Sequence, residues 1–252
     1  MIISIITATY NSAKTLERTF QSVLNQTFKE IEYWVIDGGS TDGTLDIVRK
    51  YEPIFGGRMH WISERDKGIY DAMNKGVSRC TGDIIGLLNS DDFYTTPEVL
   101  EDIVHAFSSD VDAVYGDVHF VKIDDEKKVR YYSGCLFRPW MVRLGYMPPH
   151  PSLYLRRSVY EKYGHYKSNY RISADFEIIA RLFYKYKIPY KYLHKDMVTM
   201  RMGGVSTQNI RARIVGAEED LDACKKLGIW TCRPMVYMKF FIKQAQAMLI
   251  KK

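Results

Sequence analysis

Short apolar runs rich in β-branched residues alternate with helical patterns through the first half of the chain. Four such runs predict strands at residues 2–7, 32–36, 59–62 and 83–88. The segments between them space their apolar residues as on the buried face of a helix, at residues 15–25, 44–51 and 69–79. This alternation predicts an α/β fold with right-handed crossovers and a mostly parallel sheet flanked by helices.

The second half of the chain is less regular and contains several prolines. Its pattern predicts a helix at 98–107, a strand at 113–115, a hairpin at 118–132, a strand at 152–155 and helices at 158–163 and 174–186. Asp124-Asp125-Glu126 marks the turn of the hairpin, and Gly203-Gly204 marks a loop before a basic helical tail.

Polar residues follow the predicted strands where each one ends. They are Thr9 and Asn11, Asp37, Glu64 and Asp66, and Asn89 to Asp92. In parallel α/β sheets, ligands bind just beyond the carboxyl ends of the strands. We therefore expect these residues to form one polar rim with a binding function.

The segment Leu87-Leu88-Asn89-Ser90-Asp91-Asp92 runs from an apolar strand directly into two adjacent carboxylates. Adjacent carboxylates repel each other, and a divalent cation relieves the repulsion. Oxygen ligands of this kind suit Mg²⁺ or Mn²⁺, which can also hold a diphosphate. A solvated turn is an equally good interpretation of the spacing alone.

The strand that ends at Asp37 continues into Gly38-Gly39-Ser40-Thr41-Asp42-Gly43-Thr44. The glycines let the backbone approach a ligand closely, but the segment is neither a dinucleotide fingerprint nor a phosphate-binding Walker loop. Asp37 could accept hydrogen bonds from a base or ribose. Ser40 and Asp42 have the alternative of capping the next helix, and Asp42 suits that role better.

Composition narrows the function classes. The chain of 252 residues is 46% hydrophobic and 26% charged, which is typical of a globular protein, and its net charge is +6. The cations are scattered until the last fifty residues and no nucleic-acid motif accompanies them, so we expect no nucleic-acid partner. The four cysteines lack the spacing of a metal site, and the sequence shows no secretory signal. It also has no apolar run long enough to span a membrane. These features favour a cytoplasmic protein.

Four segments together resemble the family 2 glycosyltransferases with a GT-A fold. They are Thr7-Ala8-Thr9-Tyr10-Asn11, residues 37–44, residues 64–76 and Asn89-Ser90-Asp91-Asp92. The resemblance covers residues 1–205 and is closest to transferases that build bacterial surface polysaccharides. It implies a nucleotide-sugar half at 1–117, a smaller acceptor half at 118–205 and a basic helical tail at 206–252.

The resemblance also implies roles for the rim residues in binding a nucleotide-sugar donor, such as a UDP-sugar. Thr7, Thr9 and Asn11 would line the nucleotide pocket, Asp37 would contact the base and Asp66 would lie near the nucleotide. Asp92 would ligate Mn²⁺ or Mg²⁺, and Asp91 would face the ribose or the donor sugar. The sequence indicates no third metal ligand.

Inverting transfer requires a base that removes the proton of the acceptor hydroxyl. The resemblance implies Asp175 for this role, with Glu177 as the second choice. Asp175 opens a predicted helix, so a helix cap is the alternative interpretation. His150 and Arg201 are further candidates near the acceptor or the diphosphate, although a histidine between prolines is also typical of a turn.

The tail at 230–252 mixes aromatic and basic residues, which is typical of an interfacial helix. Such enzymes act on glycan or lipid-linked acceptors, so peripheral contact with the inner membrane surface is one interpretation. Packing of the tail on its own domain is the other interpretation.

Two alternative functions remain for the chain. One is a sugar-1-phosphate nucleotidyltransferase, although the Gly-rich loop with Arg and Lys expected of that class is missing. The other is a catalytically inactive nucleotide-sugar-binding protein.

Overall fold

The computed structural model describes residues 1–122, 127–202 and 210–249. Within these residues nine strands form one sheet in the order β3-β2-β1-β4-β8-β6-β9-β5, and β7 pairs with β6. The strands are β1 (Ile3–Thr9), β2 (Ile31–Asp37), β3 (Met59–Ser63), β4 (Ile84–Leu87), β5 (Phe93–Tyr94), β6 (Ala113–Val121), β7 (Lys128–Tyr132), β8 (Tyr154–Arg156) and β9 (Tyr190–Arg201). The α-helices are α1 (Leu16–Leu24), α2 (Thr44–Tyr51), α3 (Ile69–Val77), α4 (Val99–Ala106), α5 (Arg157–Tyr163), α6 (Ala174–Ile179), α7 (Ile210–Lys226) and α8 (Arg233–Leu249).

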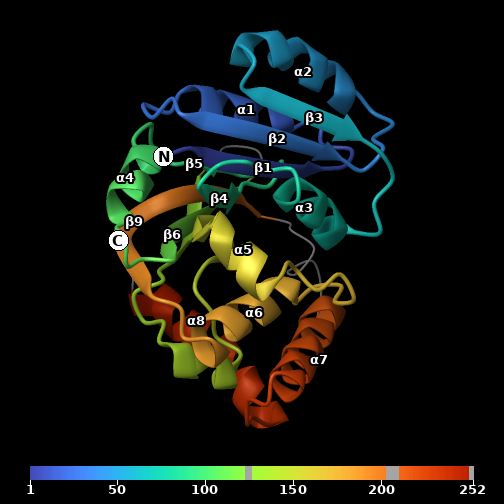
Figure 1. The fold of residues 1–252 in the computed structure, drawn as a ribbon. Coiled ribbons are helices and arrows are strands. Elements are labelled where there is room, and N and C mark those ends of the chain that lie inside the picture. The colour runs from blue at the N-terminus through green and yellow to red at the C-terminus, as the bar shows by residue number, and fades with distance from the viewer. Residues whose placement is uncertain (123–126, 203–209, 250–252) are drawn as a thin grey trace.

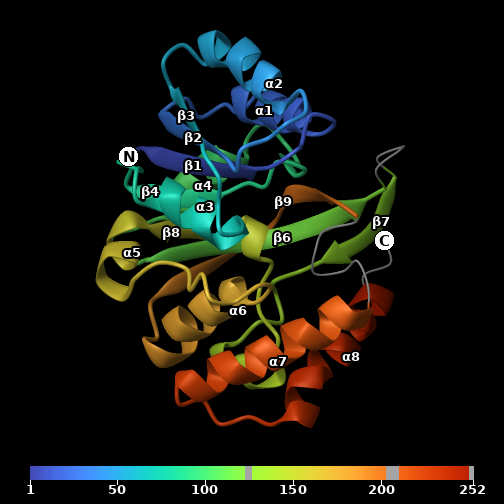
Figure 2. The same cartoon turned by 90° about the vertical axis from the view of Figure 1, so that its right-hand side faces the viewer.

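The first four strands form the predicted parallel half of the sheet. β1 pairs in parallel with β2 and β4, and β3 pairs in parallel with β2. Figures 1 and 2 show α1 and α2 on one side of these strands and α3 on the other. Because both faces are covered, every residue of β1 is buried, which explains its continuous apolar run.

The remaining strands make a mixed sheet. β8 is antiparallel to both β4 and β6, β9 is parallel to β6, and β5 is antiparallel to β9. The short strand predicted at 113–115 and the first run of the predicted hairpin are one strand, β6, and its pairing with β7 confirms the hairpin. The predicted turn at Asp124-Asp125-Glu126 and the Gly203-Gly204 loop lie outside the described residues.

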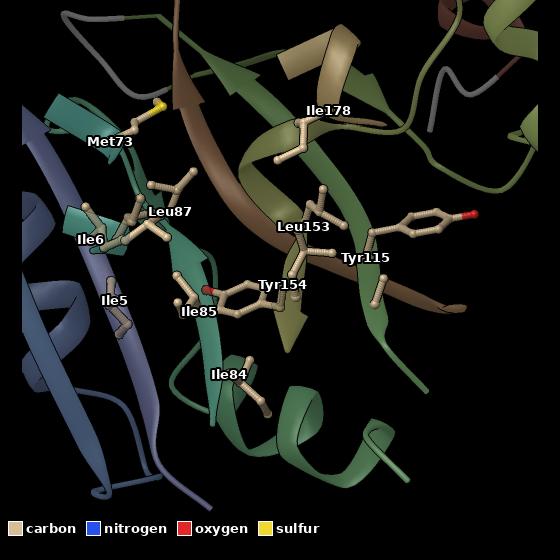
Figure 3. Close-up of a cluster of buried hydrophobic side chains, with 14 of the residues drawn as sticks. Ile5, Ile6, Met73, Ile84, Ile85, Leu87, Tyr115, Leu153, Tyr154 and Ile178 are labelled. Carbon is tan, nitrogen blue, oxygen red and sulfur yellow. The ribbon is translucent and has the colours of Figure 1, made fainter. Parts of the chain in front are cut away.

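Two halves of the sheet share one core (Figure 3). Ile6 and Leu87 of the parallel half lie in the same cluster as Leu153 and Tyr154 of the mixed half. The ring of Tyr154 lies directly over Gly86, where an added Cβ would stand 2.0 Å from its Cε1 atom. The missing side chain in β4 therefore makes room for a tyrosine from the neighbouring strand.

The predicted basic tail forms two helices that pack on the domain. α7 lies against α6, and α8 lies against β7 and the short 3-10 helix η2 (Pro139–Leu144). Figure 2 shows both helices on the same side of the sheet as α6. Val236 and Gln246 of α8 are buried, and Gln246 donates a hydrogen bond to the carbonyl oxygen of Ser133. Among the described residues, no helix combines the length and apolarity needed to cross a bilayer.

Candidate active site

The carboxyl ends of β1, β2 and β3 form the predicted rim. Thr9 is paired in register with Asp37, and Asp37 with Ser63. The hydroxyl of Thr9 is buried and has no hydrogen-bond partner in the described part of the chain. A buried polar atom without a partner is costly, and its place at the rim suits a donor or acceptor supplied by a ligand.

Asp37 organises the loop that follows β2. Its carboxylate accepts hydrogen bonds from the backbone N–H groups of Gly39 and Ser40, both at 3.0 Å, and from the hydroxyl of Ser63 at 2.6 Å. The side chain is fully buried, so its direct role is to hold this loop in shape. A contact with a nucleobase would require one of these bonds to be exchanged.

Asn11 joins the β1–α1 loop to the β2–α2 loop. Its Oδ1 atom accepts a hydrogen bond of 2.9 Å from the backbone of Thr41, and its own N–H donates to the hydroxyl of Ser40 at 2.8 Å. The backbone of Asn11 has a φ of 49°, a left-handed conformation that asparagine tolerates better than most residues. Asp42 accepts a hydrogen bond from the N–H of Thr44 at 2.9 Å, although Gly43, and not Asp42, occupies the capping position of α2.

An exposed aromatic side chain lies on the rim. Tyr10 is 63% exposed, and an added Cβ on Gly38 would lie 3.5 Å from its ring and 2.9 Å from a carboxylate oxygen of Asp66. Asp66 in turn forms an ion pair with Lys75. Burial raises the pKa of Asp66, and the hydrogen bond from Lys75 opposes that rise. Tyr10 was not among the predicted site residues; its signal was an aromatic residue at a strand end between Thr9 and Asn11.

Thr7 does not line a pocket. It is fully buried, and its hydroxyl bonds the carbonyl oxygen of Leu88 at 2.7 Å and the hydroxyl of Tyr33 at 2.9 Å. The residue therefore ties β1 to the end of β4 inside the core. We leave Thr7 out of the donor site for this reason.

Asp91 and Asp92 lie at the end of β4 in a poorly hydrated position. Asp92 is 1% exposed, and its carboxylate accepts a hydrogen bond of 2.9 Å from the side chain of Asn89. Burial raises the pKa of both carboxyls, and for Asp92 the charge of Asp91 raises it further. Arg201, the residue that ends β9, donates to the carbonyl oxygen of Asp91 at 3.1 Å.

This acid pair fits a divalent cation. Two neighbouring buried carboxylates disfavour each other's charge, and a bound cation would remove that penalty. The described residues contain no group of three metal-ligating side chains placed together. Mg²⁺ and Mn²⁺ sites that also hold a diphosphate need only one or two carboxylates from the protein, so the pair is sufficient.

Asp175 lies in the first turn of α6. Its Oδ1 atom accepts hydrogen bonds from the N–H of Phe176 at 2.8 Å and from the hydroxyl of Tyr70 at 3.3 Å. Ser173, not Asp175, occupies the capping position of α6, so the alternative of a simple cap does not hold. Burial raises the pKa of Asp175, while the Phe176 N–H and the ammonium of Lys243 lower it.

Glu177 is wrong as a second choice for the base. It is buried, and its carboxylate receives two nitrogens of Arg181, with Nε and Nη2 each 3.0 Å from an oxygen. Arg181 also donates to the carbonyl oxygens of Gly164 and His165. The carboxylate is thus committed to a buried ion pair that fixes the chain before α6.

His150 is a buried residue that contacts Tyr166. It is buried in the short 3-10 helix η3 (His150–Ser152), and its Nε2 atom is 2.9 Å from the hydroxyl of Tyr166. Burial lowers the pKa of His150 to about 4, so its ring is neutral at neutral pH. Its place near the acceptor or the diphosphate stays a prediction; in this structure His150 contacts Tyr166, whose ring stacks on Tyr70 at 6.1 Å.

An α/β sheet with polar residues at the ends of its parallel strands and an acid pair after β4 is consistent with a GT-A type fold. The family model for glycosyl transferase family 2 matches residues 4–183, and the chain belongs to this family. A glycosyltransferase of PGL/p-HBAD biosynthesis from Mycobacterium tuberculosis is 31% identical over 207 residues, which cover 81% of this chain and 78% of the relative. The chain is therefore a glycosyltransferase, and the nucleotidyltransferase alternative is rejected.

Solved structures with the same fold support this assignment. TarS residues 1–349 of S. aureus in complex with UDP-GlcNAc superpose with a TM-score of 0.65 at 18% identity, over 100% of this chain and 76% of that one. A mannosyltransferase from Pyrobaculum calidifontis in complex with GDP-Man and Mn²⁺ superposes with a TM-score of 0.66 at 18% identity, over 99% of this chain and 70% of that one. The predicted GT-A fold is confirmed.

Proposed function

We propose that this glycosyltransferase is a metal-dependent inverting enzyme. It moves one sugar from a nucleoside diphosphate carrier, most simply a UDP-sugar, to a hydroxyl of a glycan or lipid-linked sugar. The observation that carries the proposal is the buried Asp91–Asp92 pair, which has Arg201 as its neighbouring cation. The mannosyltransferase from Pyrobaculum calidifontis, which has the same fold, is in complex with GDP-Man and Mn²⁺, and this adds support.

On the donor side, different rim residues bind different parts of the nucleotide sugar. The exposed ring of Tyr10 offers an apolar face to the nucleobase beside Gly38, and Thr9 offers its unpartnered hydroxyl. Asp66 borders the same space, while Asp37 and Asn11 keep the two loops in place. Asp92 would hold Mn²⁺ or Mg²⁺, and Asp91 the ribose or donor sugar. A cation bound there supplies positive charge to the departing diphosphate.

On the acceptor side, Asp175 removes the proton of the attacking hydroxyl. Its raised pKa brings it closer to neutral pH, where a general base is most effective. Tyr70 and the Phe176 N–H orient the carboxylate, so one oxygen is held and the other can face the acceptor. Arg201 would help to hold the diphosphate beside Asp91.

A donor screen tests the proposal. Purified protein, Mn²⁺ or Mg²⁺ and a set of nucleotide sugars should release nucleoside diphosphate, and chelation of the cation should stop the release. Asp92→Asn should lose cation-dependent nucleotide binding, whereas Asp175→Asn should keep binding and lose transfer by about 100- to 10,000-fold. Asp46→Asn, at an exposed carboxylate paired with Arg49, is the matched control. Full turnover by Asp175→Asn would refute the base assignment, and cation-independent release would refute the metal.

We further propose peripheral contact with the inner, cytoplasmic membrane surface. Beside the buried face of α8, Met238 and Phe241 are 43% and 67% exposed one turn apart, and Trp230 before the helix is 68% exposed. Exposed aromatic residues beside cations such as Arg233 favour a bilayer interface. Phe241→Gln should reduce co-sedimentation with vesicles containing phosphatidylglycerol, and equal binding of both proteins would contradict this contact.

A further inference from the structure

Two cations meet over one aromatic ring beside Asp175. The ammonium of Lys243, on α8, lies 4.9 Å from the ring centre of Tyr132, and the guanidinium carbon of Arg130, on β7, lies 5.9 Å from the same centre. Arg130 also lies 4.7 Å from the ring centre of Phe120. Since β7 and α8 pack against each other, the two charges are held close together by the fold.

Neither charge is neutralised. Both side chains are only partly exposed, and within the described ranges no carboxylate lies at ion-pair distance from Lys243 or Arg130. The nearby carboxylate of Asp220 is already paired with Lys239. Burial, then the charges of Lys239 and Arg130, lower the pKa of Lys243 to about 8, while the carboxylates of Asp220 and Asp175 act in the opposite direction.

A third cation acts on Arg130. After burial, the charge of Arg213 on α7 is what lowers the pKa of Arg130. Withdrawing like charges from water without a counterion is unfavourable, so the arrangement favours a bound anion. We call Arg130 and Lys243 the cation cluster; Arg213, an exposed residue, adds positive charge near Arg130.

The position of the cation cluster indicates whether the bound anion belongs to the donor or to the acceptor. Arg201 is the cation that acts on Asp91 and Asp92, whereas Lys243 acts on Asp175. The donor diphosphate belongs with the first group and the acceptor hydroxyl with the second.

We propose that the cation cluster binds the phosphate or diphosphate group of a phosphorylated sugar acceptor. The inference rests on the proposed function, because it takes Asp175 to mark the acceptor side. Arginine and lysine supply charge-assisted hydrogen bonds to phosphate oxygens, and their place beside Asp175 would align the acceptor hydroxyl for attack. The acceptor is then a sugar ester of phosphate, carried either on a lipid or in solution.

Inorganic pyrophosphate is the probe, titrated by calorimetry into the full chain in EDTA so that the acid pair holds no cation. Wild type should bind it, and Lys243→Gln and Arg130→Gln should each weaken binding about tenfold. Lys243→Arg should retain binding because it keeps the charge. Lys162→Gln is the matched control, since Lys162 lies 5.0 Å from the ring centre of Tyr163 outside the cluster.

Asp92→Asn should not weaken pyrophosphate binding, and circular dichroism should show that every variant is folded. Vesicles of phosphatidylcholine with phosphatidic acid, which display a phosphate ester on a bilayer, distinguish the two sources. Their competition with pyrophosphate indicates a lipid-borne acceptor, and pyrophosphate binding without competition indicates a soluble one. Affinity unchanged in Lys243→Gln and Arg130→Gln, or binding to the vesicles alone, would overturn the cluster's role.

The two proposals fail separately. Nucleotide release from a donor without pyrophosphate binding would overturn the acceptor-phosphate site and leave the transferase function intact. Pyrophosphate binding through Lys243 without any donor turnover would overturn the proposed reaction and leave an anion site.

Discussion

The hydroxyl of Tyr70, on α3, donates a hydrogen bond of 3.3 Å to the carboxylate of Asp175, at the start of α6. The same O–H also donates to the carbonyl oxygen of Ile172, so its one proton is shared between the two acceptors. Tyr70 therefore connects the parallel half of the domain to the carboxylate proposed as the base. The rigid stack of Tyr70 on Tyr166 holds this connection in place.

Tyr70→Phe should change the pH dependence of transfer. In the wild type, the hydrogen bond from Tyr70 favours the charged form of Asp175. Its removal should raise the pKa of the Asp175 carboxyl and move the acid limb of the rate profile to higher pH. We expect a loss of about three- to tenfold in kcat. A pH profile of kcat for both proteins checks this; an acid limb that stays in place would remove Tyr70 from the mechanism.

Substitutions at Asp175 and at Glu177 should have different effects on the free energy of unfolding. Burial disfavours the charge of Asp175, so Asp175→Asn should leave the free energy of unfolding unchanged or increase it. Glu177→Gln breaks a buried ion pair and should cost about 3–5 kcal/mol. Urea unfolding at neutral pH measures both. Equal losses in the two variants would contradict this division into catalytic and structural carboxylates.

His150 should make the protein sensitive to mild acid. Its pKa is about 4 in the folded chain against an ordinary 6.5, so the unfolded chain binds the proton first. The free energy of unfolding should therefore fall as the pH falls from about 6.5 towards 4. Between pH 7 and pH 5 this group accounts for about 2 kcal/mol. His150→Gln should lose that part of the decrease, and urea unfolding at both pH values should detect it.

Gly86→Ala should destabilise the core. The added methyl group would meet the ring of Tyr154, which is fully buried and holds the hydroxyl of Tyr94 at 2.7 Å. Overpacking of this kind costs about 1–3 kcal/mol or more. Gly43→Ala is the matched control, because its Cβ would lie 3.7 Å from Ala13, an ordinary contact. Thermal melting of both variants distinguishes a local clash from a general intolerance of alanine.

Tyr10→Ala should raise KM for the donor about five- to tenfold with little change in kcat, because an aromatic contact with the base contributes about 1 kcal/mol. Tyr10→Phe should keep the wild-type KM, since it retains the ring. If the alanine variant has the KM of wild type, the base lies elsewhere on the rim.

Much of the donor half could be predicted because its signals are local. β1 begins with a run rich in isoleucine, and α2 begins and ends where its periodicity predicted. β9 was missed, because Lys191, Lys195 and Asp196 interrupt its pattern and its partner β6 is far away in sequence. The burial of Thr7 and the neutral state of His150 were also out of reach, since each depends on contacts with residues well separated in the chain.

The sequence by itself determined the parallel half of the sheet, the acids at its strand ends and the family, because apolar periodicity and short motifs act over neighbouring residues. The tertiary structure alone decided which of those polar residues reach the rim, since burial depends on what the whole fold packs against each side chain. It also brought Lys243 of α8 beside Arg130 of β7. Charges so far apart in the chain meet only when α8 packs against β7.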